Sequence, residues 1–226
     1  MSFDRLARPY RLLETLAFGN ALQRARTFWI DKIPSPKRAL IVGEGNGRFL
    51  CELLCTHPKI DIDCVDASER MLDLARTRVR ETCIESQERV RFFHEDVLTW
   101  SPSASYDLLV THFFLDCFPP EEVKQIVQKL GYAAASDAIW LIADFAIPSS
   151  QVAGMHARLW LRGMYSFFQI TAGIKVKQLV DPTSCLCEMG FVRTASQVFR
   201  AGMLKSHVYQ RGDKVRLASA LTTDSR

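Results

Sequence analysis

The 226-residue sequence has no apolar stretch long enough to cross a lipid bilayer. Its first residues, Met1 to Arg5, also lack the apolar core of a signal peptide. Both absences favour a cytoplasmic protein without a membrane span. Hydrophobic residues make up 48% of the chain and charged residues 24%, which suits one globular domain with a sizeable core.

Metal-binding signatures are missing as well. The seven cysteines are an odd number and lie scattered, without the second close pair of Cys or His that a zinc site would need. No carboxylate cluster points to a catalytic metal either. We therefore expect no metal ion, and we expect the cysteines to be reduced residues that serve packing, as is usual in the cytosol.

The chain carries little net charge. Its formal charge of +4 permits an anionic partner but does not require one, and Lys and Arg form no dense patch of the kind that binds nucleic acid. We therefore expect no nucleic-acid partner. The low charge is equally compatible with a monomer and with a homodimer.

Strand-like and helix-like segments alternate through the middle of the chain. This alternation predicts an α/β fold in which a parallel sheet is covered by helices on both faces. Two later strand-like segments, Phe191–Phe199 and 203–210, are joined by Arg200–Gly202 and predict an antiparallel hairpin. The five earlier strand segments are 39–43, 60–66, 90–94, 107–112 and 138–144, and the helices between them cover 48–56, 68–85 and 121–135.

The most informative motif follows the first strand segment. An apolar run from Ala39 to Val42 leads into Gly43-Glu44-Gly45-Asn46-Gly47, and a helical pattern begins at Arg48. Strand, glycine turn and helix form the nucleoside- or phosphate-binding corner of Rossmann-like sheets. A dinucleotide fingerprint would need its third glycine at position 48, so the spacing argues against a nicotinamide cofactor.

The Gly-x-Gly-x-Gly spacing resembles motif I of the class I S-adenosylmethionine-dependent methyltransferases. That family has a Rossmann-like, doubly wound sheet of seven strands, mostly parallel with a C-terminal antiparallel hairpin, in agreement with the hairpin predicted above. The layout is similar to the ubiquinone- and menaquinone-biosynthesis type of small-molecule methyltransferase. The resemblance implies S-adenosyl-L-methionine as cofactor, held by the loop residues Gly43, Glu44, Gly45, Asn46 and Gly47.

This interpretation divides the chain, as one methyltransferase domain, into five parts. Residues 1–36 are a helical cap and residues 37–147 the cofactor-binding core. Aromatic and long apolar residues in 148–180 predict a helical insert after the fifth strand, which would act as a substrate lid. Residues 181–211 supply the last helix and the hairpin, and 212–226 form a loose polar tail.

Acidic residues at two further strand ends match the family's pattern. Asp66 lies about 20 residues beyond the glycine turn, where a carboxylate accepts hydrogen bonds from the ribose hydroxyls. The alternative is that Asp66 only caps the next helix. After the third strand, the resemblance implies that Asp96 holds the adenine amine and that Val97 meets the ring, although Asp96 also suits a simple turn. The neighbours assigned with Asp66 are Ala67, Ser68 as helix cap, and Met71.

One position departs from the family. An acid usually stands two residues before the first motif glycine and helps to hold the methionine ammonium, but this chain has Ile41 there. Glu44, inside the loop, either takes over that contact or simply faces water. A lost cofactor site is a third possibility.

The segment after the fourth strand resembles motif IV. His112 and Phe113 would lie under the methionine and ribose part of the cofactor. The candidate bases are His112 and Asp116 after this strand, Asp144 at the end of the fifth, and His156 in the insert. Histidine ranks first because its ordinary pKa is near neutral. We therefore place His112 before His156, and we assign Asp116 to the substrate side.

The substrate side is predicted from aromatic residues of the insert. Trp160, Tyr165 and Phe168 would line an apolar pocket over the sheet edge, or they would belong to a packed helix. The predicted reaction is methyl transfer to a small molecule, most readily O-methylation of a hydroxylated apolar or aromatic metabolite. A nucleic-acid or protein methyltransferase would instead carry Asn/Asp-Pro-Pro-Tyr/Phe after the fourth strand. A non-catalytic protein that kept the fold is the remaining alternative.

Overall fold

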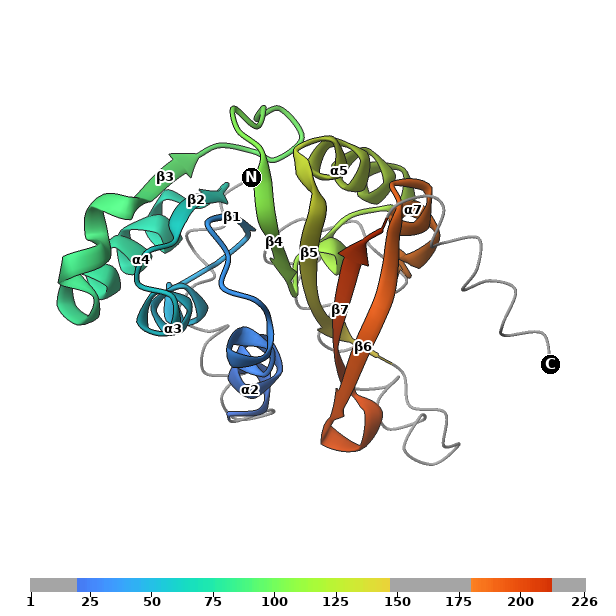
Figure 1. Ribbon diagram of the computed structural model, residues 1–226, viewed down its shortest axis with the longest axis horizontal. Helices are drawn as coiled ribbons and strands as arrows, with labels where there is room; N and C mark the ends of the chain where they lie inside the picture. The colour runs from blue at the N-terminus through green and yellow to red at the C-terminus, as the bar shows by residue number, and fades with distance from the viewer. Residues whose placement is uncertain (1–19, 147–179, 213–226) are drawn as a thin grey trace.

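A seven-stranded β-sheet forms the centre of the protein. The computed structural model describes residues 20–146 and 180–212, and its sheet has the strand order β3-β2-β1-β4-β5-β7-β6 (Figure 1). The first five strands in this row are parallel to one another, and β7 runs antiparallel to both β5 and β6. The predicted fold class is confirmed. The strands are β1 (Arg38–Val42), β2 (Asp61–Asp66), β3 (Val90–His94), β4 (Tyr106–His112), β5 (Ala134–Phe145), β6 (Phe191–Phe199) and β7 (Leu204–Arg211).

Helices cover both faces of this sheet. On one face lie α3 (Arg48–Thr56) and α4 (Glu69–Thr82), and on the other lie α5 (Pro120–Tyr132) and α7 (Thr183–Glu188). A further helix, α2 (Ala21–Thr27), lies at the end of the sheet toward which β4 points (Figure 1). Both faces are therefore apolar, which explains why the central strands are continuous hydrophobic runs.

The strand β1 illustrates how the two cores are separated. Ile41 packs with the α3 and α4 residues, whereas Leu40 and Val42 pack with the α5 residues, because successive side chains of a strand point to opposite faces. All three side chains are at most 2% exposed. A polar residue at any of them would have to be paired, and the position of Ile41 in particular is part of a closed apolar core.

Several predicted boundaries need correction. α4 ends at Thr82 and a 3-10 helix, Ile84–Arg89, follows it, so the predicted helix to residue 85 is too long. The predicted helix over 121–135 ends at Tyr132, and β5 begins at Ala134 rather than at residue 138. The alanine-rich segment joins the sheet because Ala134 pairs with Tyr106 at the start of β4. Tertiary pairing thus overrides the helix preference of alanine.

The order of the strands reverses direction at β1. The chain moves outward from β1 to β2 and β3, and then returns to place β4 on the other side of β1. In open α/β sheets of this kind, ligands bind outside the carboxyl ends of the strands at this switch point. The loops that follow β1, β2, β3 and β4 all begin at this edge.

Candidate active site at the sheet's switch point

The loop after β1 is a sharp turn made of left-handed glycines. Gly43, Gly45 and Gly47 have φ angles of 71°, 73° and 80°. A Cβ on Gly43 would lie 2.3 Å from the ring of Phe114, and a Cβ on Gly47 would lie 2.7 Å from the Cα of Ala75. A Cβ on Gly45 would have no described heavy atom within 4 Å. Two glycines are thus needed for packing, and the third leaves open space next to the backbone.

Asp66, the last residue of β2, is bound to this loop. One carboxylate oxygen accepts a hydrogen bond from the Gly45 N–H at 3.2 Å, and the other accepts from the Ser68 N–H at 2.9 Å. Burial raises the pKa of Asp66, while these two N–H groups counteract the rise. Strand end and glycine loop therefore meet as the sequence predicts.

Next to Asp66, the helix cap predicted at Ser68 is confirmed, whereas the cofactor contacts of Ala67 and Met71 stay predictions. Ser68 is the N-cap of α4, and its hydroxyl accepts a hydrogen bond from the Met71 N–H at 3.3 Å. The Ala67 carbonyl lies 3.3 Å from Nε2 of His94. The contact between Ala67 and His94, together with the pairing of Asp66 with His94, joins the ends of β2 and β3 and so brings Asp66 and Asp96 to the same edge.

Asp96 and Val97 begin a tight turn after β3. A carboxylate oxygen of Asp96 accepts from the Leu98 N–H at 2.9 Å, and its carbonyl accepts from the N–H groups of Thr99 and Trp100. Asp96 is exposed, while the side chain of Val97 is buried. Asp96 thus does stabilise a turn, and its exposed carboxylate is also available to a ligand.

Glu44 lies between the first two glycines and is not simply turned to water. Its Oε1 accepts hydrogen bonds from the N–H groups of Phe49 at 3.1 Å and Leu50 at 3.0 Å, in the first turn of α3. Burial raises the pKa of Glu44 to about 7, against the lowering effects of these donors and of Arg26. The hypothesis that Glu44 merely faces water is wrong; its ammonium contact remains a prediction.

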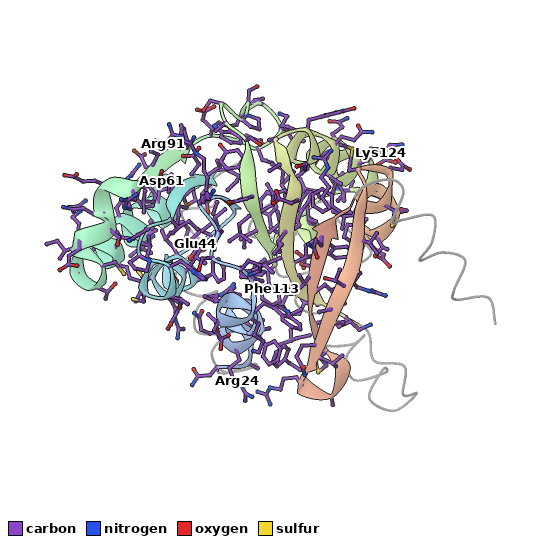
Figure 2. The ribbon with its side chains drawn as sticks, viewed as in Figure 1. Arg24, Glu44, Asp61, Arg91, Phe113 and Lys124 are labelled. Atoms are coloured by element: carbon purple, nitrogen blue, oxygen red, sulfur yellow. The ribbon has the colours of Figure 1, made fainter. Side chains whose placement is uncertain are left out.

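The end of β4 presents His112 and Phe113. The His112 ring packs edge-on against Phe49 of α3 with centroids 4.8 Å apart, and its pKa is lowered to about 3, chiefly by burial. Phe113 has a φ of 52°, rare for a residue other than glycine, and its ring centroid lies 5.0 Å from that of Phe145. Figure 2 labels Glu44 and Phe113 after the adjacent strands β1 and β4.

A pair of acids follows β4 and ends β5. Asp116 is only 5% exposed, and burial raises its pKa to about 6. Asp144 has a raised pKa, first from burial and then from the charge of Asp116. Its Oδ1 is buried and has no described hydrogen-bond partner. The Cys117 Sγ lies 3.6 Å from an Asp116 oxygen, and burial, followed by the charges of both acids, raises the pKa of this thiol.

The predicted lid falls outside the described residues. This applies to His156, Trp160, Tyr165 and Phe168. Within the described part of the chain, no three His, Cys, Asp or Glu side chains are arranged to hold a metal ion. The helices described there include none that is both long and apolar enough to span a membrane.

Sequence reasoning missed three residues that shape this edge. Arg26 of α2 lies with its guanidinium carbon 5.0 Å from the Phe113 ring centroid, and its charge acts on both Glu44 and His112. Phe114, not Phe113, packs against Gly43. Arg78 of α4 donates to the Asn46 carbonyl at 3.0 Å. No local pattern marks these contacts, because each joins segments far apart in the sequence.

Comparison with known proteins finds similar sequences over part of the chain. A methyltransferase-domain family model matches residues 40–139. Polyamine aminopropyltransferase 2 of Bacillus anthracis is 34% identical over 93 residues, covering 37% of this chain and 25% of that protein. Ribosomal RNA large subunit methyltransferase G of Psychromonas ingrahamii is 28% identical over 129 residues, covering 55% and 32%. The malonyl-[acyl-carrier protein] O-methyltransferase of Bacillus anthracis is 26% identical over 108 residues, covering 48% and 37%.

Solved structures share the fold at low sequence identity. An O-methyltransferase family 2 protein from Planctomyces limnophilus, in complex with apigenin, has a TM-score of 0.70 and 14% identity, covering 94% of this chain and 62% of that one. A methyltransferase of calicheamicin biosynthesis, in its S-adenosylhomocysteine-bound form, has a TM-score of 0.64 and 18% identity, covering 90% and 56%.

The matches cover only part of these relatives. This chain spans between 25% and 37% of the curated proteins and about three fifths of the two solved chains. The family match, the strand order and the glycine corner nevertheless agree with one another. They identify residues 40–139 as a methyltransferase domain, within a chain that has the Rossmann-like fold of solved methyltransferases.

Proposed function

We propose that the protein transfers a methyl group from S-adenosylmethionine to an oxygen of a small hydroxylated apolar or aromatic molecule. The observation that carries this proposal is the open space at Gly45, directly beside the carboxylate of Asp66 at the switch point of the sheet. A nucleoside can approach the backbone there, because no Cβ intervenes, and can meet an acid able to bind its ribose hydroxyls.

The residues present fit the cofactor in kind. The glycine loop and Asp66 would hold the ribose end, and Asp96 with the Val97 N–H would hold the adenine. Glu44 would receive the methionine ammonium in place of an acid at Ile41. S-adenosylmethionine supplies an electrophilic methyl group on a sulfonium centre when it is bound. The protein then has to align the acceptor, exclude water and remove a proton.

For proton removal we propose Asp116 ahead of His112. A general base works best when its pKa lies near the working pH, and burial brings Asp116 to about 6 but His112 to about 3. In this role the Asp116 carboxylate accepts the acceptor's hydroxyl proton as the oxygen becomes the nucleophile. His112 would instead pack under the cofactor, between Phe49 and the end of β4. His156 remains a candidate base in the insert.

The acceptor class rests on the insert and on the structural neighbours. Trp160, Tyr165 and Phe168 are proposed to line an apolar pocket over the strand ends. Several neighbours that share the fold are named as O-methyltransferases, and one of them was solved with apigenin. These names support a hydroxylated aromatic acceptor.

RNA methylation is a second candidate. It is favoured by the likeness to a ribosomal RNA methyltransferase over 55% of this chain. Against it, the end of β4 and the two residues after it read Thr111-His112-Phe113-Phe114 instead of the Asn/Asp-Pro-Pro-Tyr/Phe motif that stacks an extruded base. The modest net charge of +4 also provides little electrostatic attraction for an RNA backbone.

The test is methyl transfer to defined acceptors. The protein is incubated with S-adenosylmethionine labelled in the methyl group and with a panel of hydroxylated flavonoids and simpler phenols. Ribosomal RNA without modifications forms a separate arm. We expect a labelled O-methyl product and equimolar S-adenosylhomocysteine in the phenol arm, both lost in Asp66→Ala. Transfer only to RNA would establish the second candidate, and transfer to neither, despite cofactor binding, would contradict both acceptor classes.

A further inference from the structure

A single lysine on α5 holds the turn that follows β3. The Lys129 ammonium donates hydrogen bonds to the carbonyls of Val97 at 3.0 Å, Leu98 at 2.5 Å and Trp100 at 2.8 Å. An ammonium group has three N–H donors, so all three are used on this one turn. Bonds from a charged donor are roughly twice as strong as neutral ones.

The bonded carbonyls belong to one compact turn of backbone. The N–H groups of Thr99 and Trp100 both donate to the Asp96 carbonyl, at 3.0 and 2.8 Å, and the Leu98 N–H donates to the Asp96 side chain. Carbonyls gathered at one end of such a turn carry partial negative charge, which a cation there stabilises. Lys129 therefore favours this one backbone conformation over alternatives in which the carbonyls separate.

The opposite end of the turn carries the groups assigned to adenine. Asp96 is exposed, and no described residue accepts a hydrogen bond from the Val97 N–H. The side chains of Val97 and Trp100 are each only 3% exposed and pack in the core below. Apolar burial thus attaches the turn to the protein, while Lys129 determines the orientation of its polar groups.

We propose that Lys129 is a positioning residue for adenine recognition. By holding three carbonyls at one end of the turn, it fixes the Asp96 carboxylate and the Val97 N–H at the other end, where they bind the amine and a ring nitrogen of the base. This proposal rests on the proposed function, since it assumes that S-adenosyl ligands bind at this edge. Lys129 itself touches neither the ligand nor the reacting atoms.

The test compares Lys129→Met with Lys124→Met. Lys124, labelled in Figure 2, lies on the same helix and is about half exposed. Among the described residues its only ion pair is with Glu188 at 3.8 Å, so its substitution provides a matched loss of one charge. Calorimetry measures binding of S-adenosylhomocysteine and of S-inosylhomocysteine, in which a carbonyl replaces the adenine amine. The ratio of the two affinities reports on adenine recognition, which a general loss of stability would not change.

We expect Lys129→Met to weaken S-adenosylhomocysteine about tenfold, as for the loss of a charged hydrogen bond. Its preference over the inosyl analogue should fall at least about threefold. Lys124→Met should match the wild type in both. Amide hydrogen exchange should accelerate in residues 96–100 of the Lys129 variant and remain unchanged along α5. If the methionine variant does not fold, Lys129→Gln, which retains a donor, takes its place.

The affinity ratio decides whether Lys129 has the positioning role. An unchanged affinity ratio overturns the positioning role, even if exchange in the turn accelerates, and leaves the proposed function intact. A ratio that falls equally in both variants would assign the effect to net charge and would also overturn it. If the wild type binds neither ligand, the proposed function fails and the role of Lys129 fails with it.

Discussion

The buried acids of this protein differ in whether charged partners compensate for their burial. Asp63, within β2, is 1% exposed and has both carboxylate oxygens occupied: Arg91 donates to each at 2.6 Å, and the Tyr106 hydroxyl donates to one at 2.6 Å. Asp116 and Asp144, at the ends of β4 and β5, form no ion pair with any described lysine or arginine.

The difference separates structural from chemical acids. A buried carboxylate costs several kcal/mol unless partners compensate for the lost water, and Asp63 has those partners. Among the described residues Asp116 has no charged partner, only weak donors such as the Cys117 thiol at 3.6 Å, so burial raises its pKa to about 6 and makes proton exchange near neutral pH possible. Groups with strongly shifted pKa values tend to gather at functional sites. Buried carboxylates without charged partners therefore lie at the strand ends, where they lower stability, whereas the buried carboxylate inside the sheet is compensated.

The largest expected effect comes from removing a hydrogen-bond donor from Asp63. Tyr106→Phe removes one donor from the buried Asp63 carboxylate and should lower the free energy of unfolding by about 1.5–3 kcal/mol, the range for hydrogen bonds to charged groups. Urea unfolding at pH 7.5 measures it, with the exposed Tyr132→Phe as control. Affinity for S-adenosylhomocysteine should stay the same. A loss of binding without a loss of stability would contradict the assignment of Asp63 to a structural role.

Glu44 shares features of both kinds of acid. One of its oxygens accepts hydrogen bonds, as in Asp63, and burial raises its pKa, to about 7, as in Asp116. If its ionised form binds the methionine ammonium, wild-type affinity for S-adenosylhomocysteine should increase about tenfold between pH 6 and pH 8. Glu44→Gln keeps an oxygen for the α3 N–H groups but cannot ionise, so its affinity should be weak and independent of pH. Calorimetry at both pH values decides this, and equal wild-type and variant affinities would leave Glu44 as a helix cap only.

The smallest effect, of opposite sign, is expected for Asp116→Asn. Because the folded-state pKa is raised, the folded protein binds a proton that the unfolded chain releases between about pH 4 and 6, and stability falls over this window as the pH rises. Asparagine mimics the protonated acid and removes that cost. The variant should thus be more stable than the wild type by on the order of 1 kcal/mol at pH 7.5, and the gain should disappear toward pH 4.

Unfolding curves across this pH range provide the measurement, with the exposed Asp137→Asn as control. A destabilised Asp116→Asn at pH 7.5 would mean that partners stabilise the Asp116 charge more strongly than the Cys117 thiol does, and the proposal that it serves as base would lose its support.

Much of this edge can be predicted from the sequence because its signals are local. The glycine spacing, the acid at the end of β2 and the cap at Ser68 are each contained within a few residues, and each lies as predicted. The antiparallel hairpin is local as well. Parallel strands, by contrast, pair across long separations, and this explains why the local pattern predicts helix at Ala134, where β5 begins.

The chemistry of the site was harder to predict. Histidine ranks first among bases on its ordinary pKa. That ranking ignores burial, which lowers the pKa of His112 and raises the pKa of Asp116. Arg26 and Lys129 act across contacts between distant segments, and no periodicity reveals them. Sequence therefore identifies which acids reach the edge, while packing determines which of them can exchange a proton.

The central claim, that this switch point binds an S-adenosyl ligand, is tested most directly by calorimetric titration of the purified protein with S-adenosylmethionine and S-adenosylhomocysteine. NADH serves as the control ligand, and Asp66→Ala serves as the control protein. We predict micromolar binding of both sulfur ligands, none of NADH, and affinities at least about tenfold weaker in Asp66→Ala. No binding of either sulfur ligand would mean that the departure at Ile41 marks a lost site, and would contradict the account.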